Sequence, residues 1–553
     1  MLSVILSWIY IIIISYIWGT AFLDLIGRES SNYVKSQPGI LLAGLSTLTV
    51  YAQFFSIFYK VSLLANIVML VITLLLIVLD RKSLGERIKR MKSELTAGQI
   101  IVVAVLIILF SYGTSHGFMH YDTDLYHAQS IRWIEEYGVV KGLGNLQTRL
   151  AYNSAAFCLS ALFSFSFLGI QSFHTLAGLY AFILMLICLK LFTKKQIFKA
   201  RLSNVARVVA IYYILNIFDE MVSPASDYFV TLMILAVVIL FLDLEEEGTD
   251  DYFPYALLAL LGIMVFSSKI SGAFILLIVI YPIIVLFRNK DIRSTVKFII
   301  TGLIAVVPFI VRNYILSGYM IYPISGIDIF NVEHKIPKGL AWYDSTEIKM
   351  YGRGHSDVSR AGESLGAWVP DWFKSLDTIN KVSFLAALAG LVLLVLLIIR
   401  AIIKKEANSF KKYLLIATVN ICFVMWFITS PNIRFGCIFL WMAPALCFAD
   451  AYIEFLSTKD KMLIYKAFIC IFFAYKAITF TKEFVTEFST EYMLCQQDYG
   501  VYEAEEYELH GITFYYPKEG DRMGYDKFPS SPIKAEDIFI GDSIKDGFKD
   551  VTH

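Results

Sequence analysis

Charged residues are scarce in this chain, and neither sign of charge is in clear excess. Asp, Glu, Lys and Arg make up 17% of the 553 residues, whereas about 25% is usual in soluble proteins. Apolar residues make up 57%, and the mean hydropathy is +0.64. These proportions exclude a soluble enzyme and a disordered chain. The net charge of +1 gives no reason to expect a nucleic-acid partner.

Cysteine is also sparse, and the seven cysteines include no CxxC pair. Most of them lie within apolar runs, so we interpret them as small core residues and not as metal ligands or disulfide partners. The apolar run after Met1 has no A-x-A cleavage site, and further apolar runs follow it. We therefore interpret it as an uncleaved first membrane helix and not as a signal peptide.

Long apolar runs are what the sequence has in abundance. About fourteen runs are each long enough to cross a bilayer, which needs roughly 17–25 residues. Their centres lie near residues 13, 49, 70, 105, 182, 211, 236, 260, 280, 306, 391, 421, 446 and 471. The strands of an outer-membrane barrel would be short and alternating instead. The sequence thus predicts an all-α polytopic membrane protein.

Lysine and arginine gather in loops that fall on one side of the membrane if the spans alternate, and the positive-inside rule makes that side cytoplasmic. These basic loops are 80–96, 193–207, 288–297, 400–412 and 459–461. The chain then divides into helices at 1–112, a first outer loop at 113–168, helices at 169–315, a second outer loop at 316–380, helices at 381–480 and an acidic outer tail at 481–553.

The outer segments contain one apolar stretch and one stretch of alternating residues. The stretch 151–168 is apolar, and we expect a helix at or partly within the outer surface, because a full crossing would invert all later spans. In the tail, the alternating residues 512–516 before Pro517 predict a strand. The tail is therefore expected to be a small, partly β, segment.

The strongest local signal is the segment 120–127, which holds two carboxylates and two imidazoles directly after the fourth predicted span. The sequence predicts a helix over 124–137, with Asp122 before it and free to point into the bundle. One carboxylate can accept a proton from an attacking hydroxyl, while the other holds Mg²⁺ or Mn²⁺ or orients the acceptor. Alternatively, Asp122 or Thr123 simply caps the helix that contains Asp124.

Other ionisable residues from well-separated parts of the chain lie at the same predicted depth. They are Asp227, Lys269, Arg312 and Arg434. An ionised group at such a depth is costly unless it is paired or faces a wet cavity. We therefore expect them to converge on one outward-facing cavity, where the cations can hold a phosphate or diphosphate. The alternatives are that the cations snorkel to lipid headgroups and that Asp227 caps a helix.

The second outer loop is rich in aromatic side chains, among them Tyr322, Trp342, Tyr343, Trp368 and Trp372. Aromatic side chains stack on sugar rings, and loops over a site commonly act as lids. The same residue types also form the belt at any membrane surface. The sequence leaves both interpretations open.

Several blocks resemble a known family. The first outer loop contains DTDLYHAQ at 122–129, WIEEYG at 133–138 and RLAYNS at 149–154. With RNYILSGY at 312–319, Tyr322-Pro323 and Arg434-Phe435, these blocks resemble a group of bacterial integral membrane proteins that look like GT-C glycosyltransferases. The resemblance is specific in the first outer loop and vague in the spans. Three spans precede the motif-bearing helix, where many GT-C enzymes have one.

The resemblance implies transfer of a sugar, with inversion, from a polyprenyl-phosphate-linked donor to a glycan, lipid or protein acceptor. It places the reaction on the outer face of the bacterial cytoplasmic membrane. It implies Asp122 as the base and Asp124 as the ligand of a divalent metal (Mg or Mn) or of the acceptor, or these roles exchanged. Substrate-binding candidates are His127, Arg149, Asn153, Asp227, Lys269, Arg312, Tyr322 and Arg434.

Two other function classes fit part of the pattern. An envelope polysaccharide polymerase or ligase also has many spans and a large outer loop, but it generally relies on arginines and a histidine, not on an acidic pair. A lipid-linked sugar transporter or flippase predicts charged groups near the bilayer midplane and repeated halves. Because the ionisable residues gather at one end of the spans, the sequence favours the glycosyltransferase.

Overall fold

The protein is mostly helical and carries a two-stranded sheet near its C-terminus. The computed structural model describes residues 1–27, 36–193, 199–405, 409–455, 459–535 and 538–550. Lys194 and Lys195, which belong to one of the basic loops, lie outside the described residues.

The elements follow one another along the chain with short connections, apart from the outer segments. The first part contains α1 (Leu2–Gly27), α2 (Gln37–Phe58), α3 (Leu63–Leu79), α4 (Arg81–Glu94), α5 (Ala97–Ser115), α6 (Ala128–Glu136), α7 (Ala155–Leu162), α8 (Leu176–Cys188), α9 (Leu202–Asn216), α10 (Ser226–Glu246) and α11 (Tyr252–Ser268). The second part contains α12 (Ile280–Asn289), α13 (Ile292–Ser317), α14 (Lys338–Gly352), α15 (Leu365–Ser375), α16 (Thr378–Ile403), α17 (Ser409–Thr429), α18 (Ile433–Phe455), α19 (Lys459–Thr486), β1 (Ala504–Leu509) and β2 (Ile512–Pro517). A π-helical turn, Thr123–His127, leads into α6, and a tight helical segment, Ile270–Val279, leads into α12.

Ten of the described helices are long and apolar enough to cross a membrane. They are α1, α2, α5, α10, α12 with the segment before it, α13, α16, α17, α18 and α19. The pair α3 and α4 counts as an eleventh only if it is one span bent by 83°. Every predicted run is helical, but α8, α9 and α11 are shorter than a full span. The number fourteen therefore stays a prediction.

The stretch 151–168 holds no helix long enough to cross a membrane, as expected, and its helix is enclosed by neighbouring helices. Its α7 has 8 residues, all of them buried, and packs between α2 and α6. At 1.5 Å per residue α7 is about 12 Å long, well short of the roughly 30 Å hydrocarbon core. Small residues such as Ala155, Ala156 and Ala161 allow this close packing. The apolar run at 151–168 therefore reflects burial within the protein.

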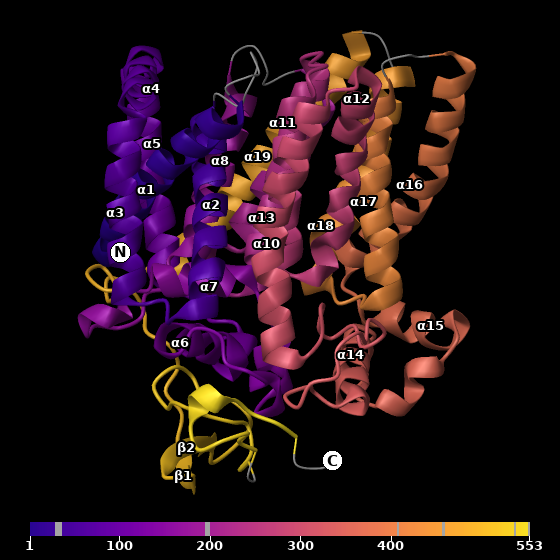
Figure 1. Cartoon of the computed structure of the whole chain (residues 1–553). Helices are drawn as coiled ribbons and strands as arrows, with labels where there is room; N and C mark the ends of the chain where they lie inside the picture. The colour runs from indigo at the N-terminus through magenta and orange to yellow at the C-terminus, as the bar shows by residue number, and fades with distance from the viewer. Residues whose placement is uncertain (28–35, 194–198, 406–408, 456–458, 536–537, 551–553) are drawn as a thin grey trace.

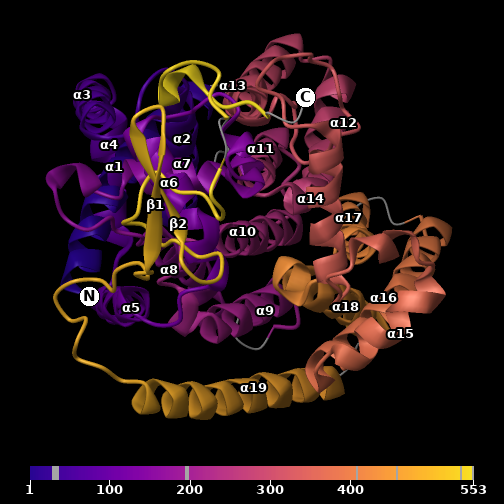
Figure 2. The same cartoon turned by 90° about the horizontal axis from the view of Figure 1, so that it is seen from below.

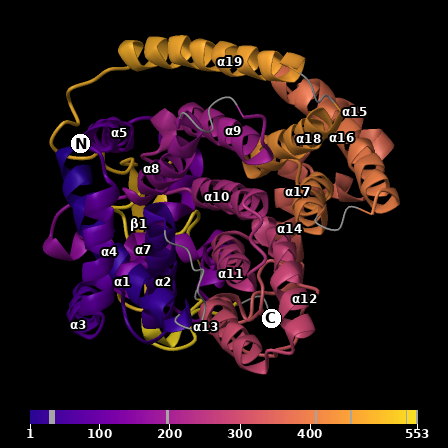
Figure 3. The same cartoon turned by 90° about the horizontal axis from the view of Figure 1, so that it is seen from above.

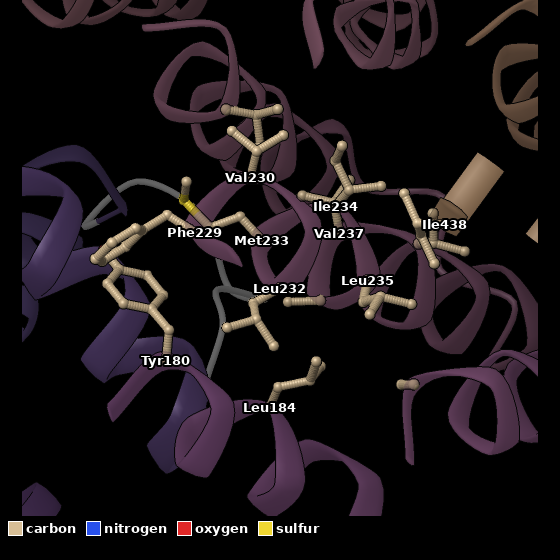
Figure 4. Close-up of a cluster of buried hydrophobic side chains, with 14 of the residues drawn as sticks. Tyr180, Leu184, Phe229, Val230, Leu232, Met233, Ile234, Leu235, Val237 and Ile438 are labelled. Carbon is tan, nitrogen blue, oxygen red and sulfur yellow. The ribbon is translucent and has the colours of Figure 1, made fainter. Parts of the chain in front are cut away.

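Helix α10 runs through the centre of the bundle, and every residue from Ser226 to Ile239 is buried. Figure 4 shows its side chains meeting Tyr180 and Leu184 of α8 on one side and Ile438 of α18 on another. The rings of Tyr180 and Phe229 are 5.5 Å apart. A helix that is apolar on all sides is typical of a bundle centre. Residues at the ends of α10 are therefore held in fixed positions.

The three predicted outer segments lie together at one end of the bundle, and α4 lies at the other end (Figure 1). They share a separate apolar core, to which the first outer loop, the second outer loop and the tail all contribute. Its members include Trp133, Leu143, Tyr319, Ile336, Phe514 and Phe548. The three segments thus fold as one layer across the end of the bundle.

Helix α19 runs along the outside of the bundle and brings the chain back to α5 (Figure 2 and Figure 3). There Phe488 stacks on Tyr112 of α5, with ring centres 5.4 Å apart. The tail then forms the antiparallel hairpin of β1 and β2. His510 and Gly511 at its turn both have positive φ, 50° and 74°, as a tight two-residue hairpin turn requires. The predicted strand at 512–516 is confirmed as β2.

Helices α1 and α2 touch at two glycines. A Cβ added at Gly44 would lie 1.7 Å from the carbonyl oxygen of Ser15, and one at Gly19 would lie 2.0 Å from that of Ile40. We predict that Gly44→Ala forces the two helices apart and lowers the stability by about 1–3 kcal/mol. Thermal unfolding of the purified protein measures this loss. Gly302→Ala is the control, because its added Cβ meets no atom closer than 3.8 Å. Equal unfolding midpoints for the two variants would contradict the prediction.

Candidate functional site

Five side chains form a charge cluster at the end of the bundle where the outer segments lie. They are His120, Asp122, Asp227, Lys269 and Arg434. The first two lie in the turn after α5, Asp227 in the first turn of α10, Lys269 directly after α11 and Arg434 in the first turn of α18. Segments that are more than three hundred residues apart in the chain therefore meet here, since Arg434 and Asp122 are 312 positions apart.

Arg434 is the centre of the charge cluster. Its Nη2 lies 2.8 Å from Oδ2 of Asp122, and its Nε lies 3.4 Å from Oδ2 of Asp227. Its Nη1 lies 2.8 Å from Nδ1 of His120. The other carboxylate oxygen of Asp227 accepts a hydrogen bond from Nζ of Lys269. Each carboxylate is thus paired with a cation, and Asp227 joins two cations.

Helix dipoles explain part of this arrangement. A carboxylate in the first turn of a helix is favourable, as is a cation at the end of one, and Asp227 and Lys269 occupy these positions. Arg434 lies at the beginning of α18, where a cation is unfavourable. The two carboxylates offset this cost, so Arg434 depends on them.

The structure decides between the alternatives that the sequence left open for these residues. Asp122 makes no capping hydrogen bond, and Thr123 Oγ1 lies 2.6 Å from Ser223 Oγ instead. Asp227 makes no capping bond either. Lys269 and Arg434 contact carboxylates and do not depend on lipid headgroups. The helix predicted over 124–137 is confirmed as the π-helical turn and α6.

The charge cluster is electrically balanced and partly accessible. Burial, and then Arg434, lower the pKa of His120, which is therefore neutral at pH 7. Two carboxylates then face two cations. The side chains of Asp122 and Arg434 are each 22% exposed and that of Lys269 is 25% exposed, whereas Asp227 is only 7% exposed. A small ligand can thus reach Asp122, Lys269 and Arg434, with Asp227 behind them.

Two aromatic side chains border the charge cluster. The ring of Phe435 lies 3.9 Å from Nζ of Lys269 and 5.0 Å from the guanidinium of Arg434, within cation–π range. Burial, and then the charges of Asp122 and Asp227, raise the pKa of Tyr126. Its hydroxyl has no hydrogen-bond partner among the described residues, so it is available to a ligand. Neither His120 nor Tyr126 was a sequence candidate, although both belong to the segment that carried the signal.

A second group of polar residues surrounds Asp344, a buried carboxylate of α14. It accepts hydrogen bonds from the hydroxyls of Tyr152 and Tyr322, each at 2.9 Å. Burial raises the pKa of Asp344. Arg149 lies near it and contacts Glu347 at 3.7 Å. The predicted residues Arg149 and Tyr322 thus meet at an acid that the sequence did not single out.

The Asp344 group borders the charge cluster through a row of aromatic rings, of which Tyr126 meets Tyr152 edge to face and Tyr152 stacks on Tyr322. The ring centres of Tyr126 and Tyr152 are 5.5 Å apart, and those of Tyr152 and Tyr322 are 6.2 Å apart. These three rings connect the first outer loop to the second. The two groups are therefore neighbours, with the Asp344 group buried.

The second outer loop supports the turn that carries Arg434. Trp372 Nε1 donates to the carbonyl oxygen of Pro431 at 2.9 Å, and Ser430 Oγ donates to that of Ile348 at 2.9 Å. Trp368 and Trp372 are buried in this contact, whereas Trp342 is 55% exposed. The two buried tryptophans are thus packing residues, and only the exposed aromatics are free to stack on a sugar.

Arg312, Asn153 and His127 lie outside both the charge cluster and the Asp344 group. Arg312 is buried and bonds to Asn153 Oδ1 at 2.9 Å and to Ser56, and among the described residues it forms no ion pair. His127 is also buried, with its ring 5.1 Å from that of Phe157. The structure thus brings Arg312 and Asn153 together, but neither is shown to contact Asp122 or Arg434.

Asp124 points away from Asp122 and holds the tail. Its carboxylate accepts hydrogen bonds from the backbone N–H of Gly500 at 3.1 Å and from the hydroxyl of Tyr502 at 2.8 Å. Its carbonyl oxygen accepts from the N–H groups of Met523 and Gly524, both at 2.9 Å. The Asp122–Asp124 pair therefore does not fit a shared metal site. Among the described residues, no group of three or more His, Cys, Asp or Glu is placed to hold a metal ion.

The fold and the charge cluster together define a helical, membrane-type protein with its polar site at one end of the bundle. Residues 1–441 match the model of a family described as a domain of unknown function, DUF8201. The match spans most of the chain, and the protein belongs to this family. It includes the whole charge cluster and ends before α19 and the tail. No curated protein and no solved structure matches the chain.

A buried acid, Glu135 of α6, also lies beneath the tail. It accepts hydrogen bonds from the hydroxyl of Tyr525 and from Ser172 at 3.3 Å. Burial raises its pKa to about 7. Nearby, burial lowers the pKa of His174 to about 4, and this ring lies 4.5 Å from that of Tyr499 in the tail. Burial thus favours the neutral form of both groups, and at Glu135 the hydrogen bond from Tyr525 offsets part of this effect.

We predict a pH dependence of tail docking from Glu135. When the tail is released, water reaches more of the carboxyl and its pKa falls toward the ordinary 4.5, so the docked state binds more protons between pH 4.5 and 7. Its contribution to docking therefore weakens as the pH rises through this range. In the Glu135→Gln variant the side chain is neutral at every pH, so its contribution to docking does not weaken as the pH rises. Consequently, the advantage of the variant over the native chain grows from pH 5 to 7 and then levels off.

Hydrogen exchange of the tail segment 496–531 measures docking in both proteins. His174 acts in the opposite direction, because its charged form disfavours docking below its ordinary pKa of 6.5. Both proteins retain His174, so its effect cancels in the difference between them. A difference that stays constant from pH 5 to 7 would contradict the prediction.

Proposed function

We propose that this protein is a GT-C-like glycosyltransferase that moves a sugar from a polyprenyl-phosphate-linked donor to an acceptor hydroxyl, with inversion. The observation that carries the proposal is the charge cluster. In it, accessible carboxylate and cationic groups meet at the end of the helical bundle where the outer segments lie. A lipid-linked sugar phosphate requires both kinds of group next to lipid. The resemblance of the first outer loop to GT-C enzymes supports the same assignment.

In the proposed reaction, the acceptor oxygen attacks C1 of the sugar and forms the new C1–O bond. The bond between C1 and the phosphate oxygen breaks, and its electron pair stays on the phosphate. Asp122 accepts the proton of the acceptor hydroxyl. Lys269 and Arg434 stabilise the charge that develops on the departing phosphate. No step is assigned to a metal ion.

This assignment changes the roles expected from the sequence in one respect. Asp227 takes the position beside Asp122 that was expected for Asp124, and it holds Lys269 and Arg434 in place. Tyr126 and Arg149 border the site and are proposed to contact the sugar or the acceptor, whereas the buried Tyr322 holds Asp344 behind them. Arg312 stays a candidate for the lipid phosphate and Asn153 a candidate for substrate binding, in a separate polar contact.

The proposed orientation follows from the basic loops. They place the end of the bundle that carries α4 in the cytoplasm and the charge cluster on the outer face of a bacterial cytoplasmic membrane. The chain is then a multi-pass protein with about fourteen crossings, in which α8, α9 and α11 cross as short helices among longer ones.

We predict that Asp122→Asn lowers the rate of sugar transfer at least about 100-fold, because a general base usually contributes at least this factor. The measurement is a mass-spectrometric profile of envelope glycans and glycolipids from cells that lack the protein and are complemented with each variant. Asp219→Asn is the matched control, because Asp219 is exposed near the same end of the bundle and makes no contact with the charge cluster through its side chain. Equal amounts of each variant in the membrane are required.

The expected result is that Asp122→Asn reproduces the profile of the deletion, whereas Asp219→Asn restores the native profile. Full restoration by Asp122→Asn, against a clear deletion phenotype, would remove Asp122 from the mechanism. If Asp122→Ala is active while Arg434→Ala is inactive, the polymerase or ligase alternative replaces the proposal.

A further inference from the structure

Helix α4 turns away from the membrane-type helices. It follows α3 after a bend of 83° and lies at the end of the bundle opposite the tail (Figure 1). A helix that leaves an apolar span at nearly a right angle runs along the membrane surface. Such helices commonly place an apolar side toward the acyl boundary and basic residues among the headgroups.

One side of α4 faces the rest of the protein and the acyl chains of the membrane. Leu84, Ile88 and Met91 recur at the spacing of one helix face and are half-buried. Arg87 on the same side is only 6% exposed, and its Nη2 lies 2.8 Å from Oδ1 of Asp24 in α1. A buried ion pair at this position fixes the rotation of α4 about its own axis.

Once that rotation is fixed, the adjacent side of α4 carries four exposed basic residues, which we call the basic flank: Arg81, Lys82, Lys89 and Lys92. Spacings of seven and eleven residues return to the same side of an α-helix, and these relate Lys82 to Lys89 and Arg81 to Lys92. Of the two acids of the helix, Glu94 lies on the opposite side, whereas Glu86 is four residues from Lys82 and three from Lys89 and so borders the basic flank. The four cations of the basic flank therefore outnumber the one acid beside them.

We propose that the basic flank of α4 binds the phosphate groups of anionic lipids at the membrane surface where this helix lies. Four cations on one flank, beside an apolar face, match a layer of lipid phosphates next to acyl chains. Each basic residue near an anionic surface strengthens binding by about fivefold. The binding is independent of the proposed sugar transfer, because the charge cluster lies at the other end of the bundle.

The test is native mass spectrometry of the full chain in detergent, titrated with phosphatidylglycerol. The variant Arg81→Gln/Lys82→Gln/Lys89→Gln/Lys92→Gln is expected to bind this lipid at least about 10-fold more weakly than the native chain. The matched control, Lys338→Gln/Lys518→Gln/Lys534→Gln/Lys545→Gln, removes the same charge from exposed residues of the outer loop and tail at the opposite end of the bundle and is expected to bind as the native chain does. Phosphatidylcholine is expected to distinguish none of the three proteins.

Several outcomes would overturn the proposal. One is equal binding of phosphatidylglycerol by the native chain and the α4 variant. Another is an equal loss in both variants, which would show a general effect of net charge. Displacement of the lipid by millimolar inorganic phosphate would make the basic flank a site for free anions. If the fourfold variant fails to fold, the single change Lys89→Gln is expected to weaken binding about fivefold, and no change would refute the proposal.

Discussion

The contacts of Arg434 with Asp122 and Asp227 join the first outer loop to the helical bundle. Arg434 begins α18, where the helix dipole and the apolar surroundings both disfavour a positive charge. Two carboxylates from other parts of the chain make this position tolerable. Removing one partner of such a group leaves an uncompensated charge, which costs far more than an ordinary surface contact. The geometry of this end of the protein therefore depends on Arg434.

The first outer loop organises the rest of the site. Asp122 connects it to α10 and α18, Tyr152 connects it to Asp344 of the second outer loop, and Asp124 connects it to the tail. A different polar group of the first outer loop holds each of these partners. The first outer loop, the second outer loop and the tail also share one apolar core. The central helix α10 provides the rigid support, because it is packed on every side (Figure 4). A ligand at the charge cluster thus contacts residues whose positions are fixed by several independent parts of the chain.

The sequence predicts the helices well because a long apolar run indicates a helix that is shielded from water, by lipid or by protein. It cannot separate a membrane crossing from a helix buried in protein, and it does not reveal that α7 is enclosed by α2 and α6. Depth along a span also indicates which residues are candidates for one site, and Asp227, Lys269 and Arg434 do meet. Depth says nothing about the side of a helix that a residue occupies. Arg312 consequently bonds to Asn153 and Ser56 and not to the charge cluster.

Two further features depend on contacts that no local pattern reveals. Asp122 and Asp124 are two positions apart, so they face different directions, and the partners of Asp124 lie more than three hundred residues away, as the separation of 378 from Tyr502 shows. Asp344 is one of several acids in the second outer loop, and only the folded chain surrounds it with Tyr152 and Tyr322.

The central claim is that Arg434 and Asp122 act as one unit, and a double-mutant cycle tests it most directly. Thermal unfolding of the native chain, Asp122→Asn, Arg434→Gln and the double variant gives the coupling free energy between the two side chains. The account predicts that the double variant loses less stability than the sum of the single changes, by at least about 0.5 kcal/mol. Strictly additive losses would contradict it.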